Sequence, residues 1–212
     1  MQSVAVTGQV LLQRFYCKRS FQDYNVRRLA AACTYLSSKL EEDSRRLRDV
    51  MLVFDRIFKR QEGPGASLMV LEPGSKEYHS AKEVIIRYER ELLRAFGFIL
   101  HSEHPHAFVI NYVHMLCEGE AAKALTQRVW STLNDSLRTP LCVRFKAEVV
   151  ACGAIFYSAR KLQIPLPESR SDPWWTVFDC RTEQLVEVVN VLHELYSRKK
   201  TFYIDVRPVA NS

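Results

Sequence analysis

The sequence predicts an all-α protein made of two related helical bundles, and three observations carry this prediction. Apolar residues recur at the three- and four-residue spacing of amphipathic helices along most of the 212 residues. No stretch indicates a β-strand with comparable clarity. One ten-residue pattern, at residues 30–39, returns at residues 151–160.

The first copy lies in a segment, residues 29–42, that predicts a buried central helix. Its first half is almost entirely apolar, and a helix that is hydrophobic on every side is a buried one. Four small residues would let neighbouring helices approach its backbone: Ala30, Ala31, Ala32 and Cys33. Lys39 then follows Tyr35 and Leu36 at helical spacing, so a charge falls on an apolar stripe. We expect the last turn of this helix to emerge at the surface with a lysine.

The second copy predicts a second central helix. The alignment matches small residues with small ones and pairs three further positions, Tyr35 with Phe156, Ser37 with Ser158, and Lys39 with Arg160. Because only two copies fit, the pattern indicates one duplicated unit and not a long solenoid. We therefore expect two bundles, each built around its own central helix.

Two further helices of the first bundle show clear periodicity. Residues 4–16 predict an amphipathic helix whose apolar side is made of Val6, Val10, Leu11 and Phe15. Asn25 is a suitable N-cap for the central helix. After that helix, residues 49–58 predict another with an apolar face made of Val50, Val53, Phe54 and Ile57.

A long surface loop is predicted for residues 59–79. The segment is rich in residues that interrupt helices, namely Gly63, Pro64, Gly65, Pro73 and Gly74. A loop of this length is either functional or a tolerated insertion, and the sequence leaves both interpretations open.

The last helix of the first bundle is predicted over residues 80–96. Gly97 follows it, and glycine at this position is a helix C-cap signal. Glu89 lies on the apolar stripe of this helix, which is otherwise made of Ile85, Leu92 and Phe96. The first bundle thus carries two charges of opposite sign on apolar faces, Lys39 and Glu89.

The second half repeats the same plan around a central helix at residues 146–162. The other elements expected there, in chain order, are a helix opened by residues 104–106, a helix over 125–137 ended by Thr139 and Pro140, an extended segment at 164–167, a short helix from Pro173, Trp174 and Trp175, and a final helix capped by Thr182 and running to about Ser197. The extended segment is expected because successive prolines prevent a helix.

The composition is that of an ordinary soluble globular protein, with 47% hydrophobic and 25% charged residues and a net charge of +6. No apolar run of about 18 residues predicts a membrane span. The N-terminus has no signal-peptide pattern and begins within a helical periodicity, so we expect a part that precedes it. Six scattered cysteines show no C-x-x-C pair, which favours buried thiols over zinc or disulfides.

No catalytic constellation is evident, since the sequence has no phosphate-binding glycine loop, nucleophile elbow or His-Glu-x-x-His motif. His101, His104 and His106 could suggest a metal, but solvated imidazoles at a helix start are the favoured interpretation because no carboxylate or cysteine completes a ligand set. Trp174 and Trp175 could stack on a base, although core packing is favoured.

Lys39 and Glu89 admit two interpretations. They could form a local ion pair that covers the edge of the core, with the lysine stem lying along apolar surface. Alternatively, they could hold the exposed ends of a partner's helix, because a lysine suits terminal carbonyls and a glutamate suits terminal amides. Spacing alone favours the first interpretation.

Several stretches resemble the cyclin family. Residues 36–42, Leu-Ser-Ser-Lys-Leu-Glu-Glu, resemble the cyclin-box signature, and residues 87–93 followed by Phe96-Gly97-Phe98 resemble the fifth helix of that box. Within the family the chain is most similar to the cyclin L group, through residues 5–11, 46–50, 104–106, 134–139, 143–145, 162–167 and 196–200.

This resemblance implies a cyclin fold of two tandem five-helix repeats, a first box at residues 1–100, a second at 101–200 and a tail at 201–212. It also implies that a first helix ahead of the box and an arginine-serine-rich tail are missing. A member of this family has no catalytic activity and no cofactor. It binds and activates a cyclin-dependent kinase, here of the PITSLRE type, and acts in the nucleus with transcription and pre-mRNA splicing factors. Its kinase-binding residues carry over to Lys39, Leu40, Glu89, Phe98 and Leu100.

A rival hypothesis is a cyclin-fold module that binds nucleic acid, as in transcription factor IIB. The basic net charge and the clusters at residues 45–48 and 198–200 motivate it. Direct nucleic-acid binding is less favoured than kinase binding, because it gives Lys39 and Glu89 no special role. An enzyme is less favoured still, for want of any site.

Overall fold

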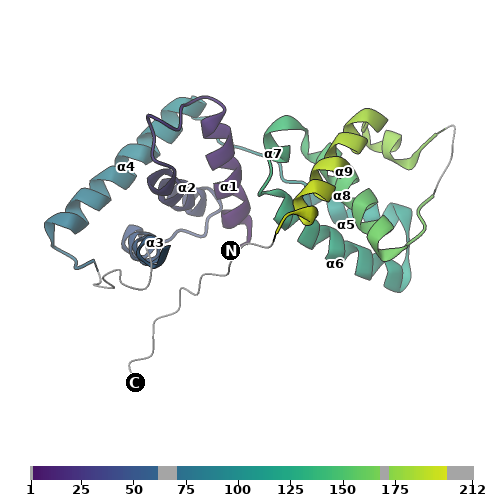
Figure 1. Cartoon of the computed structure of the whole chain (residues 1–212), viewed down its shortest axis with the longest axis horizontal. Helices are drawn as coiled ribbons and strands as arrows, with labels where there is room; N and C mark the ends of the chain where they lie inside the picture. The colour runs from purple at the N-terminus through teal and green to yellow at the C-terminus, as the bar shows by residue number, and fades with distance from the viewer. Residues whose placement is uncertain (1, 62–70, 168–171, 200–212) are drawn as a thin grey trace, which may run out of the picture. The chain divides into compact units, whose positions relative to one another are not determined.

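The computed structural model describes residues 2–61, 71–167 and 172–199, and within them every regular element is helical, which confirms the all-α prediction (Figure 1). The chain divides into two compact units that adjoin in sequence between Leu100 and His101. We call residues 1–100 unit 1 and residues 101–199 unit 2. The expected tail, residues 201–212, lies outside the described residues.

Unit 1 is built around α2 (Val26–Leu40), against which α1 (Gln2–Tyr16), α3 (Leu47–Gln61) and α4 (Lys76–Phe96) all pack. The apolar stretch of α2 that begins at Leu29 is buried as its composition predicts, with Leu29, Ala32 and Cys33 almost without exposed surface, whereas Val26 at the start of the helix is exposed. The Asn25 side chain accepts a hydrogen bond from the Arg28 amide, which confirms the predicted N-cap. The α1 face made of Val6, Val10, Leu11 and Phe15 is also buried, as predicted.

The loop predicted at residues 59–79 begins too early and ends too late. α3 continues to Gln61 because Lys59, Arg60 and Gln61 are good helix formers, and α4 begins at Lys76. The Ser75 hydroxyl accepts a hydrogen bond from the Tyr78 amide at 3.1 Å and caps this earlier start. Residues 62–70 lie outside the described residues.

The predicted face of α3 is also partly wrong. Val53 is 47% exposed, whereas Met51 is buried together with Val50. The helix is therefore rotated by part of a turn from the expected face, so that Met51 and Phe54 contact the core of unit 1.

Unit 2 is built around α8 (Ala147–Leu162), of which ten residues are buried. The elements packed against α8 are α5 (His106–Leu116), α6 (Gly119–Ser136), the short α7 (Leu141–Arg144), the 3₁₀ helix η1 (Trp174–Phe178) and α9 (Thr182–Ser197). This confirms the prediction of a second central helix. α6 begins six residues before the predicted start, α7 was not predicted, and the N-cap of α9 is Arg181 instead of Thr182.

Candidate partner-binding site

The last turn of α2 brings Lys39 against Glu89 of α4, where the lysine Nζ and the carboxylate Oε1 form an ion pair. The Lys39 side chain is 41% exposed and that of Glu89 only 12%. The Lys39 Nζ also lies 4.3 Å from the centroid of the Tyr35 ring, one helical turn earlier in α2. The two charges predicted on apolar faces therefore meet at the edge of the unit 1 core.

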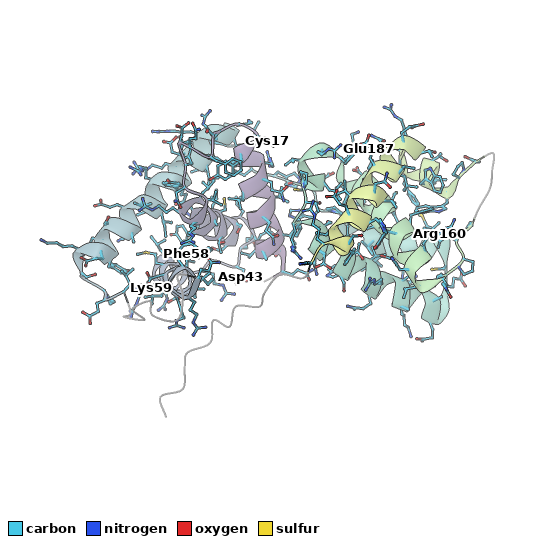
Figure 2. The ribbon with its side chains drawn as sticks, in the orientation of Figure 1. Cys17, Asp43, Phe58, Lys59, Arg160 and Glu187 are labelled. Carbon is cyan, nitrogen blue, oxygen red and sulfur yellow. The ribbon has the colours of Figure 1, made fainter. Side chains whose placement is uncertain are left out.

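The segment after α2 is held in place by two hydrogen bonds. Thr7 in α1 donates its hydroxyl to Glu41 Oε1 at 2.7 Å, and the Ser38 hydroxyl accepts the Arg45 amide at 3.2 Å. Asp43, which lies in this segment (Figure 2), pairs with Arg45 at 2.8 Å. These contacts fix the end of α2, so that Lys39 and the 39% exposed Leu40 are presented on a rigid support.

The end of α4 presents apolar side chains to solvent. Gly97 adopts a left-handed conformation with φ of 58°, as the predicted C-cap requires, and Phe98 also has a positive φ of 62°. This reversal leaves Phe98 71% and Ile99 72% exposed, while Leu100 turns back and packs against the core. Phe96, the last residue of α4, lies about 10 Å from Glu89 along the helix axis, and Phe98 follows it outside the helix.

Two basic side chains of unit 1 support this exposed segment. Lys18 donates to the Ala95 carbonyl at 3.1 Å and Arg14 donates to the Ile99 carbonyl at 3.3 Å. The Arg14 guanidinium also lies 4.9 Å from the Phe96 ring centroid. Basic groups at the C-terminal end of a helix complement its dipole. The carbonyls at the end of α4 are thus partly satisfied while Phe98 and Ile99 remain outside.

The five predicted binding residues are therefore not one contiguous cluster of contacts. Lys39 and Glu89 touch, Leu40 adjoins Lys39 in the chain, and Phe98 and Leu100 belong to the segment after α4. Only Phe98 of the last two is exposed. Sequence reasoning missed Ile99. It placed Lys39 on the same stripe as Tyr35, and the structure adds that the lysine Nζ lies over the Tyr35 ring.

The histidines predicted as solvated imidazoles behave differently from one another. His106 packs edge-on against Trp130 with ring centroids 5.0 Å apart, and its Nε2 lies 3.0 Å from Asn134 Oδ1. Burial lowers the pKa of His106 below its usual value, so the prediction of a solvated ring is wrong there. Among the described residues, no group of three His, Cys, Asp or Glu side chains is arranged to hold a metal ion.

Trp174 and Trp175 both pack in or against the core of unit 2. Trp174 is buried in the unit 2 core, and the Trp175 indole donates to the Thr182 hydroxyl at 3.2 Å, so core packing is the better interpretation of both rings. The six cysteines are free thiols, and Cys33, Cys152 and Cys180 are buried, but Cys17 is exposed, so the prediction of a buried thiol is wrong there. Burial raises the pKa of Cys33.

No described helix has the length and apolar character that a membrane span needs.

Both basic clusters that motivated nucleic-acid binding contain paired charges. Arg45 contacts Asp43, and Arg198 contacts Glu194 at 2.5 Å. Lys200 lies outside the described residues. Arg46 and Arg48 of the first cluster and Lys199 of the second are exposed, so these ion pairs involve only part of each cluster.

Comparison with known proteins agrees with the two-unit architecture. Residues 1–101 match the family model described as "Cyclin, N-terminal domain", and residues 104–197 match "Cyclin-T2-like, C-terminal domain". The chain belongs to the cyclin family. Curated relatives of this cyclin include Cyclin-L1-1 of Oryza sativa subsp. japonica, 48% identical over 205 residues, and Cyclin-L2 of Mus musculus, 40% identical over 199 residues. Cyclin-L1 of Homo sapiens is 38% identical over 202 residues.

These alignments cover 97%, 94% and 95% of this cyclin but only 46%, 37% and 37% of the relatives, so the chain spans at most about half of their length. Among solved structures, it is similar to a chain of the yeast RNA Pol II CTD kinase CTDK-1 complex, with a TM-score of 0.74 and 14% identity over 92% of this chain and 59% of that one. A chain of the CAK complex from Chaetomium thermophilum gives a TM-score of 0.61 and 16% identity over 93% of this chain and 56% of that one. At these identities the likeness confirms the cyclin fold.

Proposed function

We propose that this cyclin is a regulatory subunit that binds a cyclin-dependent kinase through unit 1 and activates it, with no catalysis of its own. The observation that carries the proposal is the Lys39–Glu89 ion pair at the edge of the unit 1 core. Membership of the cyclin family supports a kinase partner, as do the two kinase complexes that contain similar chains.

The chemistry of this surface suits the end of a partner's helix. Backbone groups at helix ends lack partners within the helix, and a lysine can donate to such carbonyls while a glutamate accepts from such amides. Leu40 next to Lys39 in the chain, and Phe98 and Ile99 in the segment after α4, are exposed apolar residues of unit 1, and they would supply the area that a partner buries. A few anchors of this kind carry most of the binding energy in typical interfaces.

Activation would then follow from selective binding. If the Lys39–Glu89 surface fits only the active arrangement of the kinase, binding shifts the kinase population toward that arrangement by the difference in affinity for the two states. A shift from 1:99 to 99:1 needs about 10⁴-fold preference. No reacting group of the cyclin is required.

We further propose a PITSLRE-type cyclin-dependent kinase as the partner, and a nuclear role in transcription and pre-mRNA splicing. The support is the similarity to proteins named Cyclin-L1 and Cyclin-L2. Transcription and splicing factors are further partners in this proposal.

The test is a pull-down of candidate cyclin-dependent kinases, read by bound kinase and by kinase activity. Wild type is compared with the double variant Lys39→Ala/Glu89→Ala. The matched control is Lys123→Ala/Glu120→Ala, which removes an exposed ion pair of unit 2 with Nζ and Oε1 2.7 Å apart.

We expect wild type and the control to bind and activate one kinase and the Lys39→Ala/Glu89→Ala protein to do neither. Equal binding by all three proteins would make Lys39 and Glu89 a core-edge ion pair only. Binding of no kinase by any of them would overturn the proposal.

A further inference from the structure

Tyr35 lies beneath the ammonium group of Lys39. The lysine Nζ is 4.3 Å from the centroid of the Tyr35 ring, within the range of a cation–π contact, and it also pairs with Glu89. Side chains four residues apart lie one above the other on a helix, and helical side chains point back toward the N-terminus. The Lys39 stem therefore runs over the ring that precedes it by one turn of α2.

The ring has a fixed place, whereas the lysine is exposed. Tyr35 is half-buried and packs against the core of unit 1. A long exposed lysine otherwise samples many rotamers, and ordering such a side chain on binding costs free energy. Contact with an anchored ring and with Glu89 restricts the ammonium before any partner arrives. Less ordering of Lys39 therefore remains for the bound state.

The ring contact leaves Lys39 able to bind a partner. An ammonium has three N–H donors, and the pair with Glu89 Oε1 uses one direction. The ring attracts the charge through its face and needs no particular donor direction. Donors of Lys39 thus remain for carbonyl groups at the end of a partner's helix.

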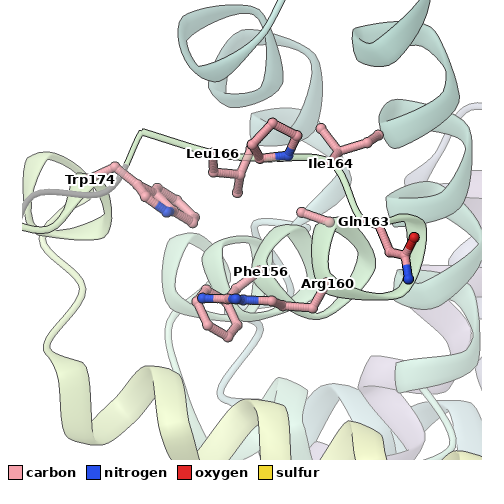
Figure 3. Close-up of a pocket in the computed structure, with 8 residues that line it drawn as sticks. Phe156, Arg160, Gln163, Ile164, Leu166 and Trp174 are labelled. Carbon is pink, nitrogen blue, oxygen red and sulfur yellow. The ribbon is translucent and has the colours of Figure 1, made fainter.

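The same arrangement occurs at the end of the other central helix. Phe156 and Arg160 occupy the matching positions of α8 (Figure 3), and the guanidinium carbon lies 5.2 Å from the centroid of the Phe156 ring. A cation four residues after an aromatic ring is therefore a recurring feature of these helix ends. Because the proposed kinase contact belongs to unit 1, the copy in unit 2 supplies a matched control for the pair in α2.

We propose that Tyr35 is a positioning residue for the kinase contact, because its ring holds the Lys39 ammonium in the orientation that binds the kinase. This inference rests on the proposed function. It adds the residue that sets the orientation of Lys39 in the free cyclin. It also predicts that the contact needs the face of the ring and not the Tyr35 hydroxyl.

The experiment changes the ring and measures the affinity for the kinase recovered in the pull-down by surface plasmon resonance. Tyr35→Phe keeps the ring face and should bind within about twofold of wild type. Tyr35→Leu keeps an apolar side chain without the ring, and we expect its affinity to fall about threefold or more. The control Phe156→Leu removes the matching ring of α8 and should bind like wild type.

A second series separates attraction of the charge from packing of the ring. Phenylalanine with none, two or three fluorines on the ring is placed at position 35, because fluorine withdraws electron density from the ring face with little change in shape. The affinity should fall stepwise with the number of fluorines, whereas a ring that only packs against the core would give equal affinities. In the free cyclin, NMR should show the Lys39 Hε protons shifted upfield by the ring, and this shift should be absent in Tyr35→Leu.

Three results would each overturn this inference: wild-type affinity in Tyr35→Leu, equal affinities across the fluorinated series, or Lys39 protons without a ring shift. As long as wild type binds the kinase, the proposed function stands after any of them. Binding of no kinase by wild type would instead overturn the proposed function, and this inference with it.

Discussion

Gly153 of α8 faces Val188 of α9 with no room for a methyl group between them. A Cβ on Gly153 would lie 2.8 Å from the Cβ of Val188. Both residues are buried in the unit 2 core. The second central helix therefore depends on a glycine where it packs against the last helix, whereas Ala32 fills the matching place in α2.

Replacing Gly153 by alanine should destabilise unit 2. We expect Gly153→Ala to lower the free energy of unfolding by about 1–3 kcal/mol, because overpacking outweighs the roughly 1 kcal/mol that alanine gains in helix propensity. Urea unfolding followed by circular dichroism measures the change. Adding Val188→Ala should recover part of it. A Gly153→Ala protein as stable as wild type would contradict the close approach.

Gly8 of α1 supplies the control for this prediction. A Cβ there would meet the Ser37 Oγ at 3.1 Å, and the next nearest atom is 3.7 Å away. That hydroxyl can rotate, although it now donates to the Thr34 carbonyl at 3.0 Å. Gly8→Ala should therefore change the free energy of unfolding by less than Gly153→Ala does.

The Lys39–Glu89 pair should show measurable coupling in unit 1 itself. Lys39→Met leaves the 12% exposed carboxylate without its partner, so we expect it to lower the free energy of unfolding by about 1–3 kcal/mol. Glu89→Gln should cost less, because the Lys39 head is better solvated. A double-mutant cycle with both changes measures the interaction. Additive effects would show that the pair contributes nothing to stability.

The central helices were predictable because long stretches of both are apolar or small. That composition accounts for much of the burial in α2 and α8, although not for that of Ser37, Ser38 and Ser158. The caps Asn25 and Gly97 have strong local preferences. Glu89 was found for the same reason, since a charge on an apolar stripe is visible from spacing. The ion pair with Lys39, the interpretation that the spacing favoured, is present in the structure, but its geometry depends on the packing of α4 on α2, which no local pattern specifies.

The remaining differences arise where local signals conflict or tertiary packing decides. Ser75 caps α4, but it directly follows Pro73 and Gly74, which indicate a loop. The exposure of Val53 depends on how α3 rotates against the core, because apolar residues occur on more than one side of it. Ile99 lies in an irregular segment after α4, and helical periodicity cannot predict which side chains are exposed in such a segment.

Ile99 should matter for the proposed kinase contact and not for folding. It is 72% exposed in the segment after α4, so its side chain contributes little to the core. We expect Ile99→Ser to weaken kinase binding about tenfold while leaving the free energy of unfolding within about 0.5 kcal/mol of wild type. Surface plasmon resonance with the kinase from the pull-down measures the first quantity.

Val177 in η1 provides the matched surface control for Ile99. It is 74% exposed and belongs to unit 2, whereas the proposed contact is assigned to unit 1, so Val177→Ser removes a similar apolar area from a residue outside that contact. Its kinase affinity should stay at the wild-type value. If Ile99→Ser also binds like wild type, the segment after α4 does not belong to the interface.

His106 should make unit 2 less stable in mild acid. Burial is the largest influence on the pKa of His106 and leaves it below 6.5 in the folded protein. The hydrogen bond to Asn134 raises this pKa and the nearby His104 lowers it, and both effects are smaller than that of burial. The unfolded chain then binds the proton more readily, so stability rises with pH through this range. The stability that the neutral His106 ring contributes to unit 2 is fully present above about pH 6.5, the pKa of this group in the unfolded chain. It is lost as the pH falls through the pKa of the folded protein.

The measurement is an NMR titration of the His106 ring signals together with urea unfolding at pH 7.5 and 5.5. The ring should titrate below pH 6.5, and His106→Gln should reduce the loss of stability between these two pH values. His193→Gln, which changes an exposed residue of α9, should leave that loss as in wild type. A ring that titrates above pH 6.5 would contradict this prediction, because burial would then not be the dominant influence on the pKa of His106.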